Sequence, residues 1–255
     1  MYPVLFKLGP LTIHTYGFCI AMGFLVALSY VSKTARRKHL NSDTLVDLCF
    51  YALVCGMIGG RVLYVILEWE NFENNWLEIF RIWNGGLVFY GGFIAALIFA
   101  WQYMKIKNMP MLKTLDILAP AVALAHGFGR IGCFFAGCCY GRMSDLPWAV
   151  TFTHPLTLAK PHVHLHPTQL YSSVMNFAIF GLLVWLSTRK PKAGIIAFAY
   201  LILYGFGRFI VEFYRGDDRG AFWFGILSPA QGIGLFMVGA GIILYYLIIL
   251  KQKKI

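Results

Sequence analysis

Residues 229–250 read PAQGIGLFMVGAGIILYYLIIL, a run that contains no charged side chain. A helix of about 20 apolar residues spans the roughly 30 Å of hydrocarbon in a bilayer. Six similar runs precede this one along the chain, and the sequence therefore predicts an all-α integral membrane protein with seven transmembrane helices. The other six runs cover residues 12–32, 45–67, 85–104, 113–135, 168–187 and 193–213.

The composition supports the same class. The chain is 59% hydrophobic and only 13% charged, whereas about a quarter of the residues in a soluble domain are charged. The N-terminus has no basic segment followed by a small-residue cleavage site, so we expect the first helix to remain in the mature protein.

Basic residues are distributed unevenly between the connectors, and this asymmetry predicts the orientation. More than half of the 22 lysines and arginines fall in four segments that share one side if the helices alternate: Lys33, Arg36, Arg37, Lys38, Lys105, Lys107, Lys113, Arg189, Lys190, Lys192, Lys251, Lys253 and Lys254. Few basic residues lie on the opposite side: Lys7, Arg81, Arg142, Lys160, Arg215 and Arg219. Because basic loops stay cytoplasmic, we expect the N-terminus outside and the C-terminus in the cytoplasm. Topology and anionic headgroups then explain the net charge of +11, and no nucleic-acid partner is expected.

The chain is expected to form a single polytopic domain over residues 1–255, because no repeat or soluble module is present. Two connectors on the predicted outer side are distinctive. Residues 69–84 carry Trp76 and Trp83, which suit an interfacial segment. Residues 136–167 are rich in Gly, Pro and His, and a connector of this length is usually functional or disordered.

Arginines inside the predicted spans are the strongest chemical signal, because a charge in a membrane needs a partner or water. Arg61, Arg130 and Arg208 occupy the predicted outer halves of their helices, and Glu212 follows Arg208 by one turn. Arg208 and Glu212 alone could be a structural ion pair. Three arginines favour a shared anionic ligand, and a lipid phosphate suits the guanidinium fork.

Glycines cluster at residues 85–92, GGLVFYGG, and at residues 127–141, GFGRIGCFFAGCCYG. For most of them the favoured interpretation is close helix packing. Around Arg130 their density favours either backbone that closely approaches a ligand or a broken helix that lines a cavity.

Histidines and cysteines raise the question of a metal site. Residues 162–166 read HVHLH, and Cys133, Cys138 and Cys139 precede them. The C-x4-C-C spacing matches no standard zinc or iron–sulfur pattern, so no metal is expected. Individual tyrosines near the predicted boundaries fit an aromatic belt: Tyr16, Tyr90, Tyr140 and Tyr171.

Several short motifs follow one another over nearly the whole chain. In order they are Tyr16-Gly17, Gly59-Gly60-Arg61-Val62-Leu63-Tyr64, residues 83–92, Gly129-Arg130-Ile131-Gly132 with Phe134, Gly137 and Gly141, His166-Pro167-Thr168-Gln169-Leu170-Tyr171, residues 208–215, and Ser228 with Gln231. Read together they resemble prolipoprotein diacylglyceryl transferases. The G-R-x-G and H-P-T-Q-L-Y blocks are the most specific.

The resemblance implies an enzyme of the bacterial inner membrane that needs no cofactor. It would move diacylglycerol from phosphatidylglycerol to the lipobox cysteine in the signal peptide of a prolipoprotein, releasing glycerol phosphate. Arg130 and Arg208 would stabilise the leaving phosphate, with Glu212 holding Arg208. The remaining substrate-binding residues implied by the motifs are Tyr16, Arg61, Gly141, His166 and Tyr171.

The chain departs from the family at polar positions. Tyr90 stands where the family commonly has His, Cys133 where it has Asn, Cys138 where an acid is frequent, and Ser172 where it has Glu. The proton acceptor is therefore open. His126, one turn before Arg130, suits a general base near neutral pH, whereas the Tyr90 phenol, with an ordinary pKa near 10, suits it poorly. Alternatives are a paralogue with another lipid donor or acceptor, and a non-catalytic binder or transporter of an anionic lipid.

Overall fold

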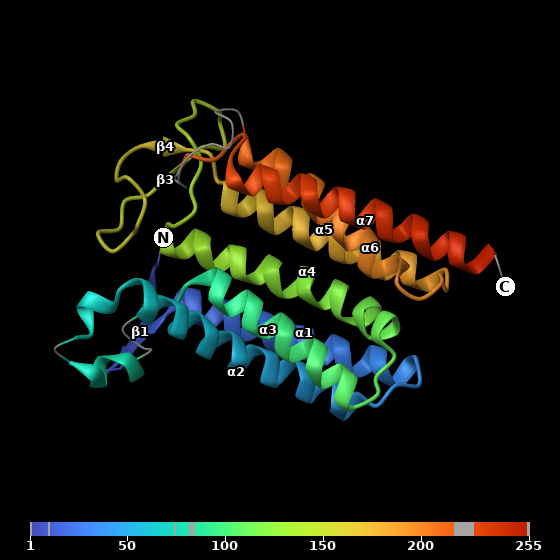
Figure 1. Ribbon diagram of the computed structural model, residues 1–255. Coiled ribbons are helices and arrows are strands. Elements are labelled where there is room, and N and C mark those ends of the chain that lie inside the picture. Colours follow the sequence, from blue (N-terminus) through green and yellow to red (C-terminus); the bar gives the residue numbers. More distant parts are fainter. Residues whose placement is uncertain (1, 10, 74, 82–84, 217–226, 254–255) are drawn as a thin grey trace. The chain divides into compact units, whose positions relative to one another are not determined.

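The computed structural model describes residues 2–9, 11–73, 75–81, 85–216 and 227–253, and most of them are helical (Figure 1). Each α-helix coincides with one of the predicted apolar runs, which confirms the helical class. The helices are α1 (Thr15–Arg37), α2 (Ser42–Leu67), α3 (Phe89–Ile106), α4 (Met111–Ala136), α5 (Thr168–Thr188), α6 (Ile195–Glu212) and α7 (Pro229–Lys253).

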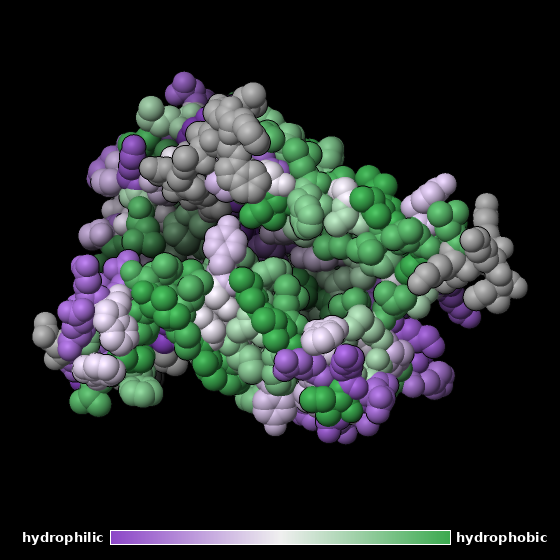
Figure 2. All heavy atoms as spheres, viewed as in Figure 1, coloured by the Kyte–Doolittle hydropathy of each residue, from purple (hydrophilic) through white to green (hydrophobic). Residues whose placement is uncertain are grey.

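Among the described helices, six are long and apolar enough to cross a membrane. The exception is α3, whose last turns carry the polar side chains of Gln102, Tyr103 and Lys105. Large apolar side chains such as Phe236, which is 76% exposed, lie on the helix surfaces, and hydrophilic side chains gather at the helix ends (Figure 2). Lipid is the environment in which such surfaces are stable. The chain is a multi-pass membrane protein.

Four short strands lie outside the helices, and none was expected from the sequence. β1 (Val4–Leu8) pairs antiparallel with β2 (Leu11–His14), directly before α1. β3 (Val150–Thr151) pairs antiparallel with β4 (His164–Leu165) inside the long connector. Backbone pairing of this kind satisfies polar groups in segments that leave the helices.

Contacts divide the chain into two compact units, Met1–Tyr30 with Leu115–Ile255, and Val31–Thr114. In the second unit, α2 and α3 approach each other through small residues. A Cβ added to Gly59 would lie 2.3 Å from the Cβ of Ala95, and one added to Gly91 would lie 2.5 Å from the carbonyl oxygen of Gly59. The close-packing interpretation is confirmed for Gly91 and Gly92, whereas Gly85 and Gly86 precede α3 and have φ of 87° and 74°.

In the first unit, glycines again mark close helix contacts. The Ser173 hydroxyl of α5 donates to the carbonyl of Gly127 in α4 at 2.9 Å, and a Cβ at Gly127 would lie 2.6 Å from the Phe177 ring. The expectation of a broken helix around Arg130 is wrong. α4 continues to Ala136, and only then does the backbone turn at Gly137, with φ of 73°.

The two connectors have local order of their own. The first contains two short 3₁₀ helices, η1 (Trp69–Asn71) and η2 (Trp76–Phe80). The longer one has a small core of Phe152, Ala159 and Leu165. A few residues named above lie outside the described part of the chain: Trp83, Arg219 and Lys254.

Asp116 is a buried acid in α4 to which the sequence drew no attention. Its two carboxylate oxygens accept hydrogen bonds from the backbone N–H groups of Gly194, at 2.7 Å, and Ala197, at 2.9 Å. These donors belong to the start of α6. A carboxylate is favourable there because the first N–H groups of a helix have no partner within it and carry a partial positive charge. Asp116 therefore ties α4 to the beginning of α6.

Replacing this cap should weaken the first unit. Asp116→Ala leaves two buried N–H groups without their acceptor, and we expect a loss of about 2–3 kcal/mol in the free energy of unfolding. Thermal unfolding in detergent measures the loss, with Asp145→Ala, which removes an exposed acid, as the matched control. Equal melting temperatures for the two variants would contradict the capping role.

Candidate functional site

An ion pair on one face of α6 forms the centre of the site. Arg208 and Glu212 are one turn apart, and an Arg208 guanidinium nitrogen lies 2.8 Å from the Glu212 carboxylate. The Arg208 side chain is 11% exposed and that of Glu212 6%. A charge buried to this degree is costly unless it is paired, so the pairing stabilises the guanidinium within an apolar helix.

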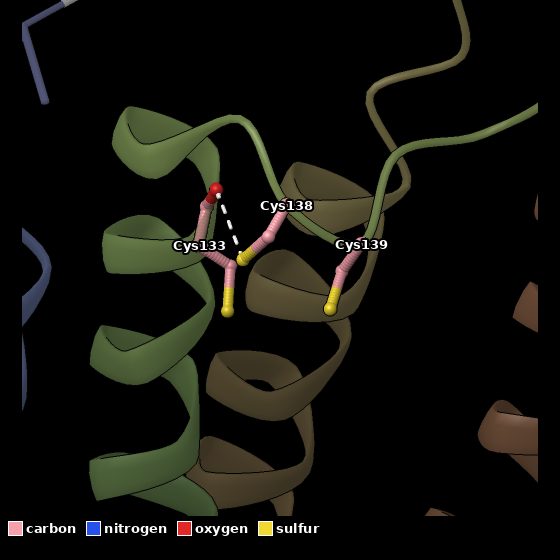
Figure 3. A group of neighbouring side chains, drawn as sticks. All are labelled: Cys133, Cys138 and Cys139. Carbon is pink, nitrogen blue, oxygen red and sulfur yellow. Dashed lines mark hydrogen bonds between the residues drawn. The ribbon is translucent and has the colours of Figure 1, made fainter. Parts of the chain in front are cut away.

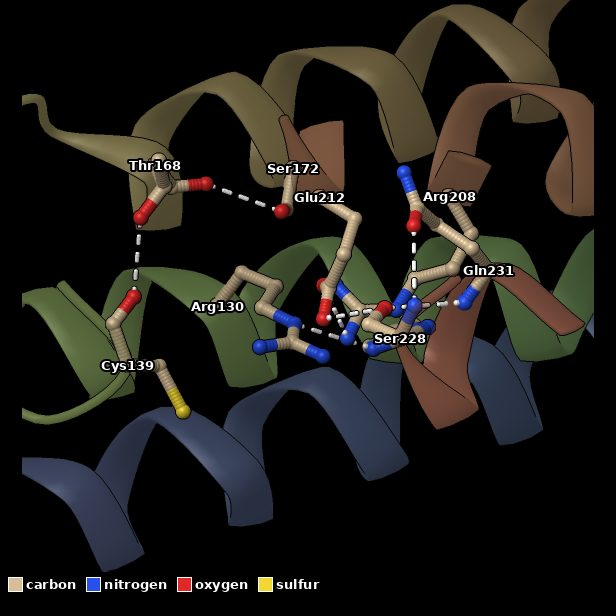
Figure 4. A network of polar contacts seen from close by, with 9 residues as sticks. Arg130, Cys139, Thr168, Ser172, Arg208, Glu212, Ser228 and Gln231 are labelled. Carbon is tan, nitrogen blue, oxygen red and sulfur yellow. Dashed lines mark hydrogen bonds and ion pairs between the residues drawn. The ribbon is translucent and has the colours of Figure 1, made fainter. Parts of the chain in front are cut away.

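The other carboxylate oxygen of Glu212 links this pair to the start of α7 (Figure 4). It accepts a hydrogen bond from the Ser228 hydroxyl at 3.1 Å. Ser228 and Gln231 cap α7 reciprocally, because the Ser228 N–H donates to the Gln231 amide oxygen and the Gln231 N–H donates to the Ser228 hydroxyl. This is a capping box, with Pro229 in the first helical position, where its missing N–H costs nothing.

Arg130 lies on α4 and is held by the residue one turn before it. Its Nε donates a hydrogen bond to Nε2 of His126 at 3.1 Å. The His126 ring also packs against Tyr204, with centroids 5.3 Å apart, and lies within electrostatic range of both Arg130 and Arg208. Figure 4 shows both arginines in one polar network. Protonation of His126 would break the hydrogen bond from Arg130 and place a third cation beside two others.

Three thiols and a phenol lie close to Arg130. The sulfur atoms of Cys133, Cys138 and Cys139 all lie within 4.8 Å of one another. Tyr16, in the first turn of α1, lies within electrostatic range of all three and of Arg130. Its position depends on a glycine, because a Cβ at Gly132 would lie 3.1 Å from the Tyr16 carbonyl oxygen.

His166 and Tyr171 anchor the long connector. The Trp148 indole N–H donates to the Tyr171 hydroxyl at 2.8 Å, and that hydroxyl lies 3.2 Å from Nδ1 of His166. Burial and then the charge of Arg142 lower the pKa of His166. The imidazole is therefore predominantly neutral near pH 7, and one hydrogen bond joins its Nδ1 to the Tyr171 hydroxyl. These contacts tie the start of α5 to Trp148 of the long connector.

Gly141 stands where three segments cross. A Cβ there would lie 2.5 Å from the Cβ of His166 and 2.6 Å from the carbonyl oxygen of Tyr214. The Gly141 N–H donates to the His166 carbonyl at 2.9 Å. A residue with any side chain would force these backbones apart, so glycine positions the connector against the ends of α5 and α6.

Among the described residues, Ser172 takes no part in a charged network. Its hydroxyl donates to the Thr168 carbonyl of the preceding turn at 2.8 Å. Two residues of the H-P-T-Q block bind the cysteine turn instead. Thr168 donates to the Cys139 carbonyl and Gln169 to the Cys138 carbonyl, at 2.9 and 2.7 Å.

Arg61 and Tyr90 belong to the second unit. The five N–H groups of the Arg61 guanidinium all point to backbone carbonyl oxygens, at 2.5–3.4 Å, and its guanidinium also lies over the Tyr64 and Phe72 rings. These contacts hold the connector after α2 and leave no donor for a phosphate. Tyr90, in the first turn of α3, is 55% exposed and contacts the Phe89 ring.

Known proteins resemble the chain over almost its full length. Residues 3–247 match a family model described as prolipoprotein diacylglyceryl transferase. The chain belongs to this family. A phosphatidylglycerol–prolipoprotein diacylglyceryl transferase of Clostridium tetani is 43% identical over 96% of this chain and 97% of its own. Proteins with this name from Clostridium perfringens, where it is numbered 2, and Finegoldia magna are each 38% identical over 98% of this chain and 97% and 96% of their own.

The first unit thus brings together five residues that the sequence singled out: Tyr16, His126, Arg130, Arg208 and Glu212. Sequence reasoning missed Tyr204, which packs against His126, and Trp148, which donates to Tyr171. Both contacts join segments that are distant in the sequence. It also missed the convergence of the three thiols, although the Gly137 that follows α4 was a usable signal, because glycine commonly ends a helix and permits a sharp turn.

Proposed function

We propose that the chain transfers the diacylglyceryl group of phosphatidylglycerol to the thiol of a prolipoprotein cysteine, the first step of lipoprotein maturation. The observation that supports this most strongly is the buried ion pair of Arg208 and Glu212, beside a half-buried Arg130 that His126 holds, in a chain that matches transferases of that name over nearly its full length. We further propose that the acceptor is the lipobox cysteine of a signal peptide.

In the proposed reaction the acceptor sulfur attacks the glyceryl carbon that carries the phosphate. A C–S bond forms, the C–O bond breaks, and glycerol phosphate leaves with the electron pair. Arg130 and Arg208 stabilise the charge that develops on the leaving phosphate, because fixed cations act strongly in a site that excludes water. Glu212 holds Arg208, His126 holds Arg130, and Tyr16 donates to a lipid oxygen.

The setting is proposed to be the inner membrane of a bacterium. Seven spans, with α3 included, place the N-terminus outside and the C-terminus in the cytoplasm. The basic residues of the alternate connectors support this orientation. The arginines of the site then face the outer half of the bilayer, where the signal peptide of an exported precursor arrives. One polytopic domain over residues 1–255 stays a prediction.

Orientation can be measured with reporters fused after residue 255. We expect a reporter that works only in the cytoplasm to be active there, and one that works only outside to be inactive. The same reporters fused after residue 160 should give the opposite pattern, because the long connector lies on the other side. An externally active C-terminal fusion would refute the orientation.

The function itself is tested with purified protein, phosphatidylglycerol and a lipobox peptide. We expect Arg130→Ala to lose about 100- to 1,000-fold in transfer rate, since one fixed donor to the developing anion is removed. Arg130→Lys should recover little, because an ammonium cannot reproduce the fork. Arg189→Ala, which removes an exposed arginine stacked over Trp185, is the control. Saturable lipid binding by the wild type without any transfer would instead identify a non-catalytic lipid binder.

His126 can be examined with two substitutions that differ in one property. In His126→Gln the amide oxygen can still accept the hydrogen bond from Arg130, whereas in His126→Leu the side chain offers no acceptor. We expect His126→Gln to stay within about tenfold of the wild-type rate and His126→Leu to lose a further 10- to 100-fold, the loss expected for a hydrogen bond to a charged group.

Tyr90→Phe is the companion measurement. Losing one phenol hydrogen bond, of order 1 kcal/mol, should cost at most about tenfold. Equally large losses in His126→Gln and His126→Leu, with Tyr90→Phe healthy, would restore His126 as the general base. An inactive Tyr90→Phe would assign that role to the phenol.

A further inference from the structure

Cys133, Cys138 and Cys139 form a compact thiol cluster at the end of α4 (Figure 3). Cys133 belongs to the last turn of the helix, and the other two lie in the turn that follows it. All three sulfur atoms lie within 4.8 Å of one another. The sequence led us to expect neither a metal nor a cofactor, because the cysteine spacing matches no standard metal-binding pattern. The turn after α4 changes that expectation, since it brings three possible ligands together.

The backbone is shaped so that the three side chains converge. The chain reverses at Gly137 with φ of 73°, and Cys139 itself has φ of 61°. A non-glycine residue in this left-handed region is uncommon and needs support from its surroundings. Thr168 and Gln169 provide it, because their side chains bind the carbonyl oxygens of Cys139 and Cys138.

The geometry of the cluster suits a thiophilic cation with one open position. Thiolates select ions such as zinc, and three sulfurs at about 2.3 Å from a tetrahedral zinc ion would be about 3.8 Å apart. The observed upper limit of 4.8 Å needs only small side-chain rotations to reach that spacing. Within the described residues, no other His, Cys, Asp or Glu joins the group. Three protein ligands and a free fourth position are typical of catalytic zinc.

Charges around the cluster also fit. Three thiolates and one Zn²⁺ carry a net charge of −1. The Arg215 side chain hydrogen-bonds to Cys139, and Arg130 is within electrostatic range of Cys133. Two guanidinium groups therefore face a group that would be anionic with zinc bound. Outer partners that hold and balance the ligands are a usual part of a metal site.

We propose that Cys133, Cys138 and Cys139 bind one zinc ion whose fourth position takes the acceptor thiol as a thiolate. The catalytic part of this inference rests on the proposed transfer; the metal site does not. On binding, the acceptor S–H proton passes to water. The sulfur then forms the C–S bond to the glyceryl carbon, and glycerol phosphate leaves with the C–O electron pair. The product thioether is neutral, binds zinc weakly and leaves the fourth position. No electron is gained or lost by the metal.

This assignment accounts for the missing base. Coordination by zinc removes the proton of a thiol outright, so no residue has to take it during the attack. His126 uses its Nε2 lone pair to hold Arg130.

The metal site is tested first, by the zinc content of the full-length protein purified in detergent with a thiol reductant. We expect about one zinc per chain in the wild type, and less than a tenth of that in Cys133→Ser, Cys138→Ser and Cys139→Ser. Cys55→Ser, which changes a cysteine of α2 outside the cluster, should keep its zinc. Gel filtration and thermal melting identify variants that fail to fold. A wild type that binds no zinc, or serine variants that fold and bind it equally, would overturn the site.

The catalytic role is tested with cobalt(II) in place of zinc, because thiolate coordination to cobalt gives a charge-transfer absorption. A lipobox peptide with cysteine should increase this absorption, and the same peptide with serine should not. Removing the metal with a chelator should slow transfer by at least about 100-fold, and zinc should restore it. An unchanged spectrum, or full activity without metal, would overturn the catalytic role. A holoenzyme that takes up zinc and the peptide thiol but transfers no lipid would refute the proposed function and leave the metal site standing.

Discussion

The ion pair between Arg208 and Glu212 is the interaction on which the arrangement of the first unit depends. It lets a guanidinium lie in the apolar helix α6, where an unpaired charge would cost several kcal/mol. Through Ser228 the same carboxylate is joined to the capping box that starts α7. One acid thus holds the Arg208 guanidinium and fixes the helix beside it, so a change at Glu212 would disturb the ion pair and the helix packing together.

The three arginines that lie within apolar helices differ in the partners of their guanidinium groups. Arg61 directs all its N–H groups to backbone carbonyls of one connector. Its hydrogen bonds are therefore satisfied without a ligand. The Nε of Arg130 donates a hydrogen bond to His126. This bond orients the guanidinium and does not involve its two terminal nitrogens. All three arginines lie in apolar runs of the sequence, and yet their hydrogen-bond partners differ. The sequence could not show this, because backbone acceptors such as those of Arg61 cannot be recognised from residue types.

Much of the fold could be predicted from the sequence, since membrane helices are decided by length and hydropathy alone. The run at residues 229–250 and the helix α7 begin at the same residue. Features that depend on distant contacts could not be read in this way. The sequence gives no sign that Asp116 accepts the first N–H groups of α6. It also does not distinguish a helix break from a close contact, and in α4 the glycine at Gly127 permits close packing against Phe177 while the helix continues. The site arginines could be recognised because a charge in an apolar run is rare. The thiol cluster could not, because it forms through left-handed backbone at Gly137 and Cys139, and no fixed spacing of cysteines in the sequence indicates such a turn.

The chemistry also explains why two different cationic groups are useful in one site. The attacking sulfur and the leaving phosphate are both anionic, and two unit charges about 4 Å apart repel by roughly 4 kcal/mol in a partly buried environment. Arg130 and Arg208 can neutralise the phosphate, but the same cations would also attract the thiolate and compete with the attack. The zinc ion that we propose at Cys133, Cys138 and Cys139 would separate these tasks, because zinc would bind the acceptor sulfur and leave the phosphate oxygens to the arginines. The arginines would then be needed only for the leaving group, and the metal would prepare the nucleophile.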